Sequence, residues 1–169
     1  MEIIKGGVTA AKGFQAAAAA AEIKYQGRTD MAPIYSEKPC RTAGTFTTNV
    51  VKAAPVKWDK CVVESKVRSQ AVIVNSGIAN ACTGAEGMEY CRETAEEAAK
   101  ILGIDAKGVL IGSTGVIGMQ LPIDRIKAGI AKLAEGRSAD LESGTEAAKA
   151  IMTTDTRKKE AAVRLEIGG

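Results

Sequence analysis

The stretch GVLIGSTGVIGMQLP, residues 108–122, joins an apolar run, a glycine-rich turn and the start of a helix. Its first part, Gly108–Gly112 (GVLIG), is short and apolar, which is typical of a strand buried on both faces. Pro122 is favoured in the first turn of a helix. An apolar stripe at helical spacing follows, formed by Ile123, Ile126, Ile130 and Leu133, and Gly136 is expected to end the helix.

Two other segments carry equally clear patterns. Ala71–Asn75 (AVIVN) is a continuous apolar run ended by Ser76 and Gly77, and it predicts a second buried strand. Met88–Leu102 predicts a helix that stops at Gly103. The expected inner face of this helix consists of Met88, Cys91, Ala95, Ala98, Ala99 and Leu102.

The remaining segments give weaker signals. Propensity favours a helix over the six alanines Ala16–Ala21, and β-branched residues favour a strand over Thr45–Val51. We also expect a short strand at Cys61–Val63, a helix from Ser138 to Ile151, and an alternating strand at Ala161–Ile167. The 138–151 helix is expected to turn Leu141, Ala148 and Ile151 inward. Together these elements predict one α/β domain over residues 1–169, of mixed α+β type, with helices packed on a layered sheet.

Composition narrows the class of protein. The 169 residues are 46% hydrophobic but only 4% aromatic, so the core should be aliphatic and rich in alanine. The net charge of +3 is too balanced for a nucleic-acid-binding surface. There is no apolar run of membrane-spanning length and no signal-peptide pattern, so we expect a cytoplasmic protein without a membrane partner.

The chain contains no histidine and four cysteines, Cys40, Cys61, Cys82 and Cys91, none of them spaced as C-x-x-C. This pattern argues against a zinc site and, without a secretion signal, against disulfides. It therefore predicts free thiols. It also excludes a catalytic dyad or triad built on an imidazole of this chain.

The glycine turn after residue 112 fails two nucleotide-binding tests. The dinucleotide fingerprint needs a glycine where Ser113 stands, although Gly115 and Gly118 supply the other two. A P-loop needs a lysine after its last glycine, and none follows Gly118. Two interpretations remain open. Thr114 and Gly115 could form an oxyanion hole for acyl transfer, or the segment could be a plain strand-to-loop turn.

Two other polar segments are open to similar alternatives. MTTDT, Met152–Thr156, is either a helix-ending turn with local hydroxyl bonds or a rim that binds an amino-acid substrate. VNSGIANACTG, Val74–Gly84, has ordinary turn chemistry but could equally line a site.

Taken together, five motifs resemble the glutamate N-acetyltransferase / ornithine acetyltransferase family of arginine biosynthesis. They are GGVTAAKGF (6–14), AGTFTTNVVKAAPV (43–56), VNSGIANACTG (74–84), IGSTGVIG (111–118) and MTTDT (152–156), in order along nearly the whole chain. In that family a precursor cleaves itself before a threonine, which becomes the N-terminal nucleophile of a β chain. The resemblance implies that the present chain is the α chain and that the nucleophile lies elsewhere.

The resemblance also assigns residues. It implies that Thr114 and Gly115 form the oxyanion hole and that Thr153 contacts the substrate. The sequence departs from the family pattern at Ile78, where asparagine is usual, and at Arg157-Lys158, where Phe-Pro commonly follows TTDT.

The implied reaction is a ping-pong transfer of acetyl from N-acetylornithine to glutamate, without a metal or redox cofactor. Some family members also use acetyl-CoA as a donor. The implied assembly is a dimer of αβ units, so the α chain alone should be inactive. A small-molecule-binding module without catalysis is the alternative function, and an unrelated nucleotide-binding domain is a third.

Overall fold

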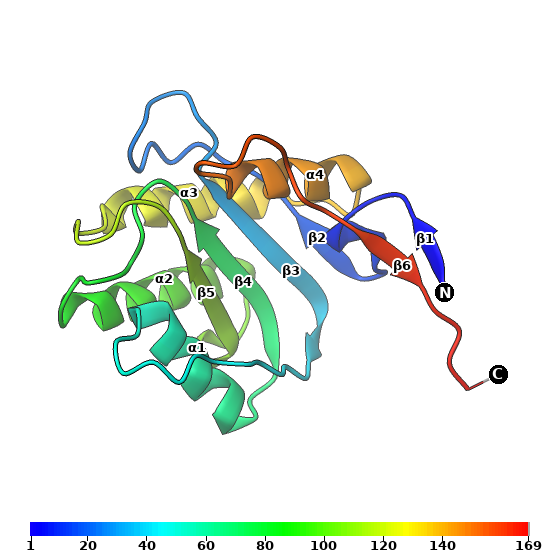
Figure 1. Ribbon diagram of the computed structural model, residues 1–169, viewed down its shortest axis with the longest axis horizontal. Coiled ribbons are helices and arrows are strands. Elements are labelled where there is room, and N and C mark those ends of the chain that lie inside the picture. Colours follow the sequence, from blue (N-terminus) through cyan, green and yellow to red (C-terminus); the bar gives the residue numbers. More distant parts are fainter. Residues whose placement is uncertain (169) are drawn as a thin grey trace.

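The computed structural model describes residues 1–168 and contains a four-stranded sheet in the order β2-β3-β4-β5. β2 and β4 run antiparallel to β3, and β5 runs parallel to β4. A second, two-stranded sheet pairs β1 with β6 near the two termini (Figure 1). The strands are β1 Glu2–Ile4, β2 Phe14–Ala16, β3 Met31–Cys40, β4 Ser69–Asn75, β5 Val109–Ser113 and β6 Ala162–Arg164. The helices are α1 Ala54–Ser65, α2 Glu86–Leu102, α3 Ile123–Gly136 and α4 Leu141–Ala150, with short 3-10 turns η1 Val8–Ala10 and η2 Ala106–Gly108.

The two apolar runs form the centre of the large sheet, as predicted. β4 and β5 pair so that Ala71 lies opposite Val109 and Ile73 lies opposite Ile111. All four side chains are buried on the same face of the sheet. The mixed α/β fold class predicted from the sequence is confirmed.

α2 and α3 cover this buried face. Cys91, Ala95 and Ala98 of α2 are completely buried, and α2 ends at Gly103 in the left-handed conformation, as predicted. Met88 was also expected on the inner face, and that part of the prediction is wrong because the residue lies in the exposed first turn of α2. α3 begins directly after Pro122 and buries Ile126, Ile130 and Leu133, which also confirms the prediction. Met31 of β3 lies beneath α3, where a β carbon added at Gly129 would collide with its sulfur.

α4 packs on the opposite face, but only over the β2–β3 half. Ala147 and Ala150 form a small buried cluster with Ala16 and Ala32. The prediction for the inner face of this helix was wrong: Leu141 and Ile151 are about 40% exposed. Small residues face inward because α4 lies close to the sheet and to η1, where Gly144 abuts Thr9. Over β4 and β5 this face remains half-exposed, at Val72, Val74 and Leu110.

The alanine run is not a helix. Ala16 ends β2, and the chain then runs extended, with Ala19 exchanging backbone hydrogen bonds of 3.0 and 3.1 Å with Met31. The alanines are short enough to lie between the sheet and helices α3 and α4, and these long-range contacts override their helix propensity.

Two predicted strands are also wrong. Thr45–Val51 is irregular and mostly exposed, because its β-branched residues meet no partner strand within residues 1–168. Cys61–Val63 lies inside α1, which starts with Pro55 in its first turn and ends at Lys66 in the left-handed conformation. The last strand does form, but it is shorter than predicted.

α1 lies along the outer edge of β5 and binds its free backbone groups. The Trp58 indole N–H donates to the Val109 carbonyl over 2.9 Å, and the Asp59 carboxylate accepts from the Ile111 N–H over 2.9 Å. Burial raises the pKa of Asp59 to about 6, and this backbone hydrogen bond only partly opposes the rise.

Candidate active site

The loops that leave β4 and β5 run side by side beyond the ends of these strands. The Thr114 N–H donates to the Asn75 carbonyl over 3.0 Å, and the Val116 N–H donates to the Gly77 carbonyl over 3.1 Å. Because β4 and β5 are parallel, both glycine-containing turns emerge at the same edge of the sheet.

Gly115 lies between these two bonded amides and requires glycine. Its φ is +129°, and a β carbon there would lie 2.8 Å from the Ile78 nitrogen and closer still to the Gly77 carbonyl. Within residues 1–168 the Gly115 N–H donates to no protein group, whereas its two neighbours do. The turn therefore presents one unpaired backbone donor beside the half-buried Thr114 hydroxyl.

The VNSGIANACTG loop (74–84) forms hydrogen bonds that support the turn around Gly115. The Asn75 side chain donates to the Ile78 carbonyl over 2.8 Å, and the Asn80 N–H donates to the Ser113 hydroxyl over 2.8 Å. Ile78 is only 5% exposed and packs in the main core. The isoleucine at this position therefore fills the core rather than facing the pocket.

Thr114, Gly115 and Thr153 line one cavity of about 370 Å³. Thr153 and Thr154 reach it from the loop after α4, where Thr153 is half-buried. The remaining lining residues are Lys24, Tyr25, Arg28, Gly77 and Val116. The structure thus brings together the three site residues predicted from the sequence, and the cavity lining contains two cations and no carboxylate.

Lys24, Tyr25 and Arg28 were not predicted. They belong to the segment between the alanine run and β3, which is fixed by the buried Asp30 carboxylate through the N–H groups of Ala21 and Ile23. The Lys24 ammonium lies 4.9 Å from the centre of the Tyr25 ring, and its hydrogen bond lowers the pKa of Tyr25. The only sign of these residues in the sequence was the presence of two cations, Lys24 and Arg28, in a glycine-containing polar loop.

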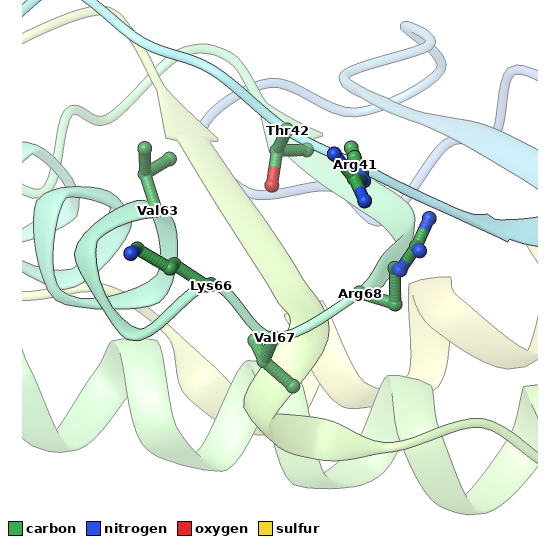
Figure 2. Close-up of a pocket in the computed structure, with 6 residues that line it drawn as sticks. All are labelled: Arg41, Thr42, Val63, Lys66, Val67 and Arg68. Carbon is green, nitrogen blue, oxygen red and sulfur yellow. The ribbon is translucent and has the colours of Figure 1, made fainter.

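A second cavity, of about 330 Å³, lies at the opposite end of β4 (Figure 2). Arg41, Lys66 and Arg68 line it, and the Thr42 hydroxyl lies 3.3 Å from that of Ser69. Because β4 begins at this cavity and ends at the Thr114 cavity, the two are separated by the length of the strand. The cationic cavity therefore contributes no group to the Thr114 site.

The four cysteines are free thiols, and Cys61 and Cys82 are exposed. Cys91 is buried, and burial, assisted by the charge of Asp59, raises the pKa of its thiol to about 12. No group of metal-ligating side chains gathers anywhere in residues 1–168. In the same part of the chain no helix has the length and apolar character needed to cross a membrane.

Comparison with known proteins identifies the family of this chain. The ArgJ family model matches residues 15–169. The chain is 52% identical to the arginine biosynthesis bifunctional protein ArgJ of Symbiobacterium thermophilum, aligned over 100% of the chain and 42% of that relative. It is 49% identical to the ArgJ protein of Gloeobacter violaceus, over 99% of the chain and 41% of the relative. The chain thus spans about two fifths of the length of these curated relatives.

Solved structures give the same result. Ornithine acetyltransferase from Mycobacterium tuberculosis, complexed with ornithine, superposes with a TM-score of 0.88 at 45% identity, covering 92% of this chain and 84% of that one. The ArgJ protein of Bacillus halodurans gives a TM-score of 0.87 at 39% identity, covering 95% of this chain and 84% of that one. These matches confirm the resemblance seen in the five motifs, and the chain therefore belongs to the ArgJ family of arginine biosynthesis bifunctional proteins.

Proposed function

We propose that this chain is the α chain of a glutamate N-acetyltransferase, and that it supplies the oxyanion hole and part of the substrate site. The nucleophile is the N-terminal threonine of a β chain cut from the same precursor, with its own α-amine as the base. The ArgJ relatives are more than twice as long as the part that this chain matches, which leaves room for a nucleophile outside residues 1–169. The working assembly is a cytoplasmic dimer of αβ units.

In the first step the threonine hydroxyl oxygen attacks the acetyl carbon of N-acetylornithine. The carbon–nitrogen bond breaks, ornithine leaves with the hydroxyl proton, and an acetyl-threonine ester remains. In the second step the amine of glutamate attacks this ester, the carbon–oxygen bond breaks, and the threonine recovers its proton. Acetyl-CoA, whose thioester carries the same acyl group, is the alternative donor. No metal or redox cofactor takes part.

Both steps develop negative charge on the acetyl oxygen, and stabilising it is the task of Thr114 and Gly115 in this proposal. The observation that carries the proposal is the free Gly115 N–H beside the Thr114 hydroxyl at the cavity that Thr153 also lines. Fixed donors of this kind lower the barrier because they need no reorganisation when the charge appears. The ornithine complex of the structural relative supports an ornithine-type substrate.

The test is acetyl transfer from N-acetylornithine to glutamate by the chain co-expressed with the rest of its precursor. We expect Thr114→Ala to lower kcat by roughly a hundred- to a thousand-fold, the usual cost of one oxyanion donor. The matched control is Thr42→Ala, which removes a threonine hydroxyl at the far cavity and should leave kcat unchanged. Unchanged turnover in T114A, or ligand binding without turnover by the wild-type complex, would refute the proposal and favour a non-catalytic binding module.

A further inference from the structure

Two side chains, the buried Ser76 and the cavity-lining Arg28, bind the backbone where α4 ends. The Ser76 hydroxyl donates to the Ala150 carbonyl over 2.6 Å, in a buried position. The Arg28 guanidinium donates to the Met152 carbonyl. Since Met152 immediately precedes Thr153, the peptide that leads into Thr153 is held by a side chain of the cavity itself.

The two donors belong to one hydrogen-bonded unit. Asp30, only 4% exposed, accepts the Ala21 and Ile23 N–H groups at 2.8 and 2.7 Å and so fixes the loop that carries Arg28. The Asp30 carbonyl accepts the Ser76 N–H over 2.8 Å, which joins this loop to the end of β4. The Arg28 loop, the end of β4 and the end of α4 are therefore linked through hydrogen bonds.

The loop after Thr153 contains an ion pair, while the Thr153 hydroxyl stays free. Two residues beyond Thr153, the Asp155 carboxylate is paired with Lys159, and this contact lowers the pKa of Asp155. Within residues 1–168 the Thr153 hydroxyl bonds to no protein group, although the residue is half-buried at the cavity. A fixed backbone with a free hydroxyl is the arrangement expected of a substrate contact.

We infer that Arg28 is a positioning residue: its bond to the Met152 carbonyl sets the Thr153 hydroxyl in place for the substrate. The inference rests on the function proposed above, in which Thr153 contacts the substrate. A planar, always-charged guanidinium suits this task because it reaches the carbonyl from the cavity wall and loses little freedom in doing so. Arg28 touches neither the reacting atoms nor the oxyanion pair in this scheme, so its removal should weaken substrate binding more than it slows chemistry.

The experiment measures kcat and KM for N-acetylornithine in the assembled enzyme. We expect Arg28→Ala to raise KM about ten-fold, the cost of one charge-assisted hydrogen bond, and to change kcat less than about three-fold. Arg28→Lys, which retains a charged donor, should recover part of the loss. The matched control is Arg125→Ala, because Arg125 also donates to a backbone carbonyl, that of Glu22 in the loop that carries Arg28, but does not line the Thr153 cavity.

The decisive measurement is the double variant. If Arg28 acts through Thr153, Arg28→Ala should add less than about two-fold to the KM of Thr153→Ala. Two results would overturn the inference and leave the proposed function intact. One is a KM increase in the double variant that equals the product of the two single increases, and the other is an unchanged KM in R28A while T153A is impaired. An unimpaired T153A would instead remove the substrate role of Thr153 and this inference with it. Should R28A fail to assemble, the same comparison can be made with R28K, measured alone and combined with T153A.

Discussion

Replacing Asp59 with asparagine should stabilise the chain at neutral pH and leave its stability unchanged in acid. Asp59 lies half-buried between α1 and β5, where its carboxylate accepts the Ile111 N–H over 2.9 Å. Burial raises its pKa from the ordinary 3.8 to about 6. An asparagine oxygen can accept the same hydrogen bond without a charge, so the substitution removes the desolvation cost and retains the contact.

The size of the stabilisation by Asp59→Asn and its pH dependence follow from the pKa of Asp59. Because the folded value lies above the unfolded one, folding favours the protonated acid. The contribution of Asp59 to stability is therefore greatest below pH 3.8 and is lost as the pH rises through about 6. A change from 3.8 to about 6 corresponds to roughly 3 kcal/mol at full burial. Solvent reaches this half-exposed carboxylate, which reduces the gain for Asp59→Asn at neutral pH to about 1–2 kcal/mol.

Thermal midpoints of matched samples at about pH 4 and about pH 8 provide the test. For a chain of this length the gain corresponds to an increase of about 2–6 °C at the higher pH only. Asp124→Asn is the control, because it neutralises an exposed carboxylate in the first turn of α3 and should not stabilise the chain. An equal increase at both pH values, or a lower midpoint for D59N at about pH 8, would refute the reasoning.

Three other outcomes are expected. Gly115→Ala should lower kcat at least about a hundred-fold, because its β carbon would collide with the neighbouring loop; steady-state kinetics check this, and retained activity would contradict it. In the native protein iodoacetamide should alkylate Cys61 and Cys82 and spare the buried Cys91, as peptide mass spectrometry can show; early labelling of Cys91 would contradict its burial. Ile78→Asn should destabilise the chain by about 2–4 kcal/mol, because it places an amide in the core, and a thermal midpoint equal to that of the wild type would count against this packing.

The sequence predicted the elements whose pattern agrees with their burial. β4, β5, α2 and α3 are apolar runs or stripes facing one shared core, so periodicity alone located them. The wrong predictions concern segments whose secondary structure depends on contacts with residues far away in the sequence. The alanine run is extended because it bonds to β3, and Thr45–Val51 has strand propensity but no partner strand within residues 1–168.

The candidate site was predictable only in part. The motifs identified Thr114, Gly115 and Thr153, but only the fold brings the loop after α4 against the turn after β5. Arg28 could not be found from the sequence, because its partner is a backbone carbonyl far along the chain. Every residue has such a carbonyl, so the residue type does not reveal the contact. The same holds for Asp30, whose partners are backbone amides.

The contacts between α1 and β5 also determine how this sheet can grow. An edge strand normally offers free N–H and C=O groups to any extended chain that arrives. On β5 the Val109 carbonyl and the Ile111 N–H are already taken by Trp58 and Asp59, so an incoming strand would first have to displace a helix. Strand addition at β5 is thereby blocked, both for aggregation between copies and for a partner chain. In the proposed αβ assembly, the β chain would therefore contact this chain elsewhere than at the β5 edge.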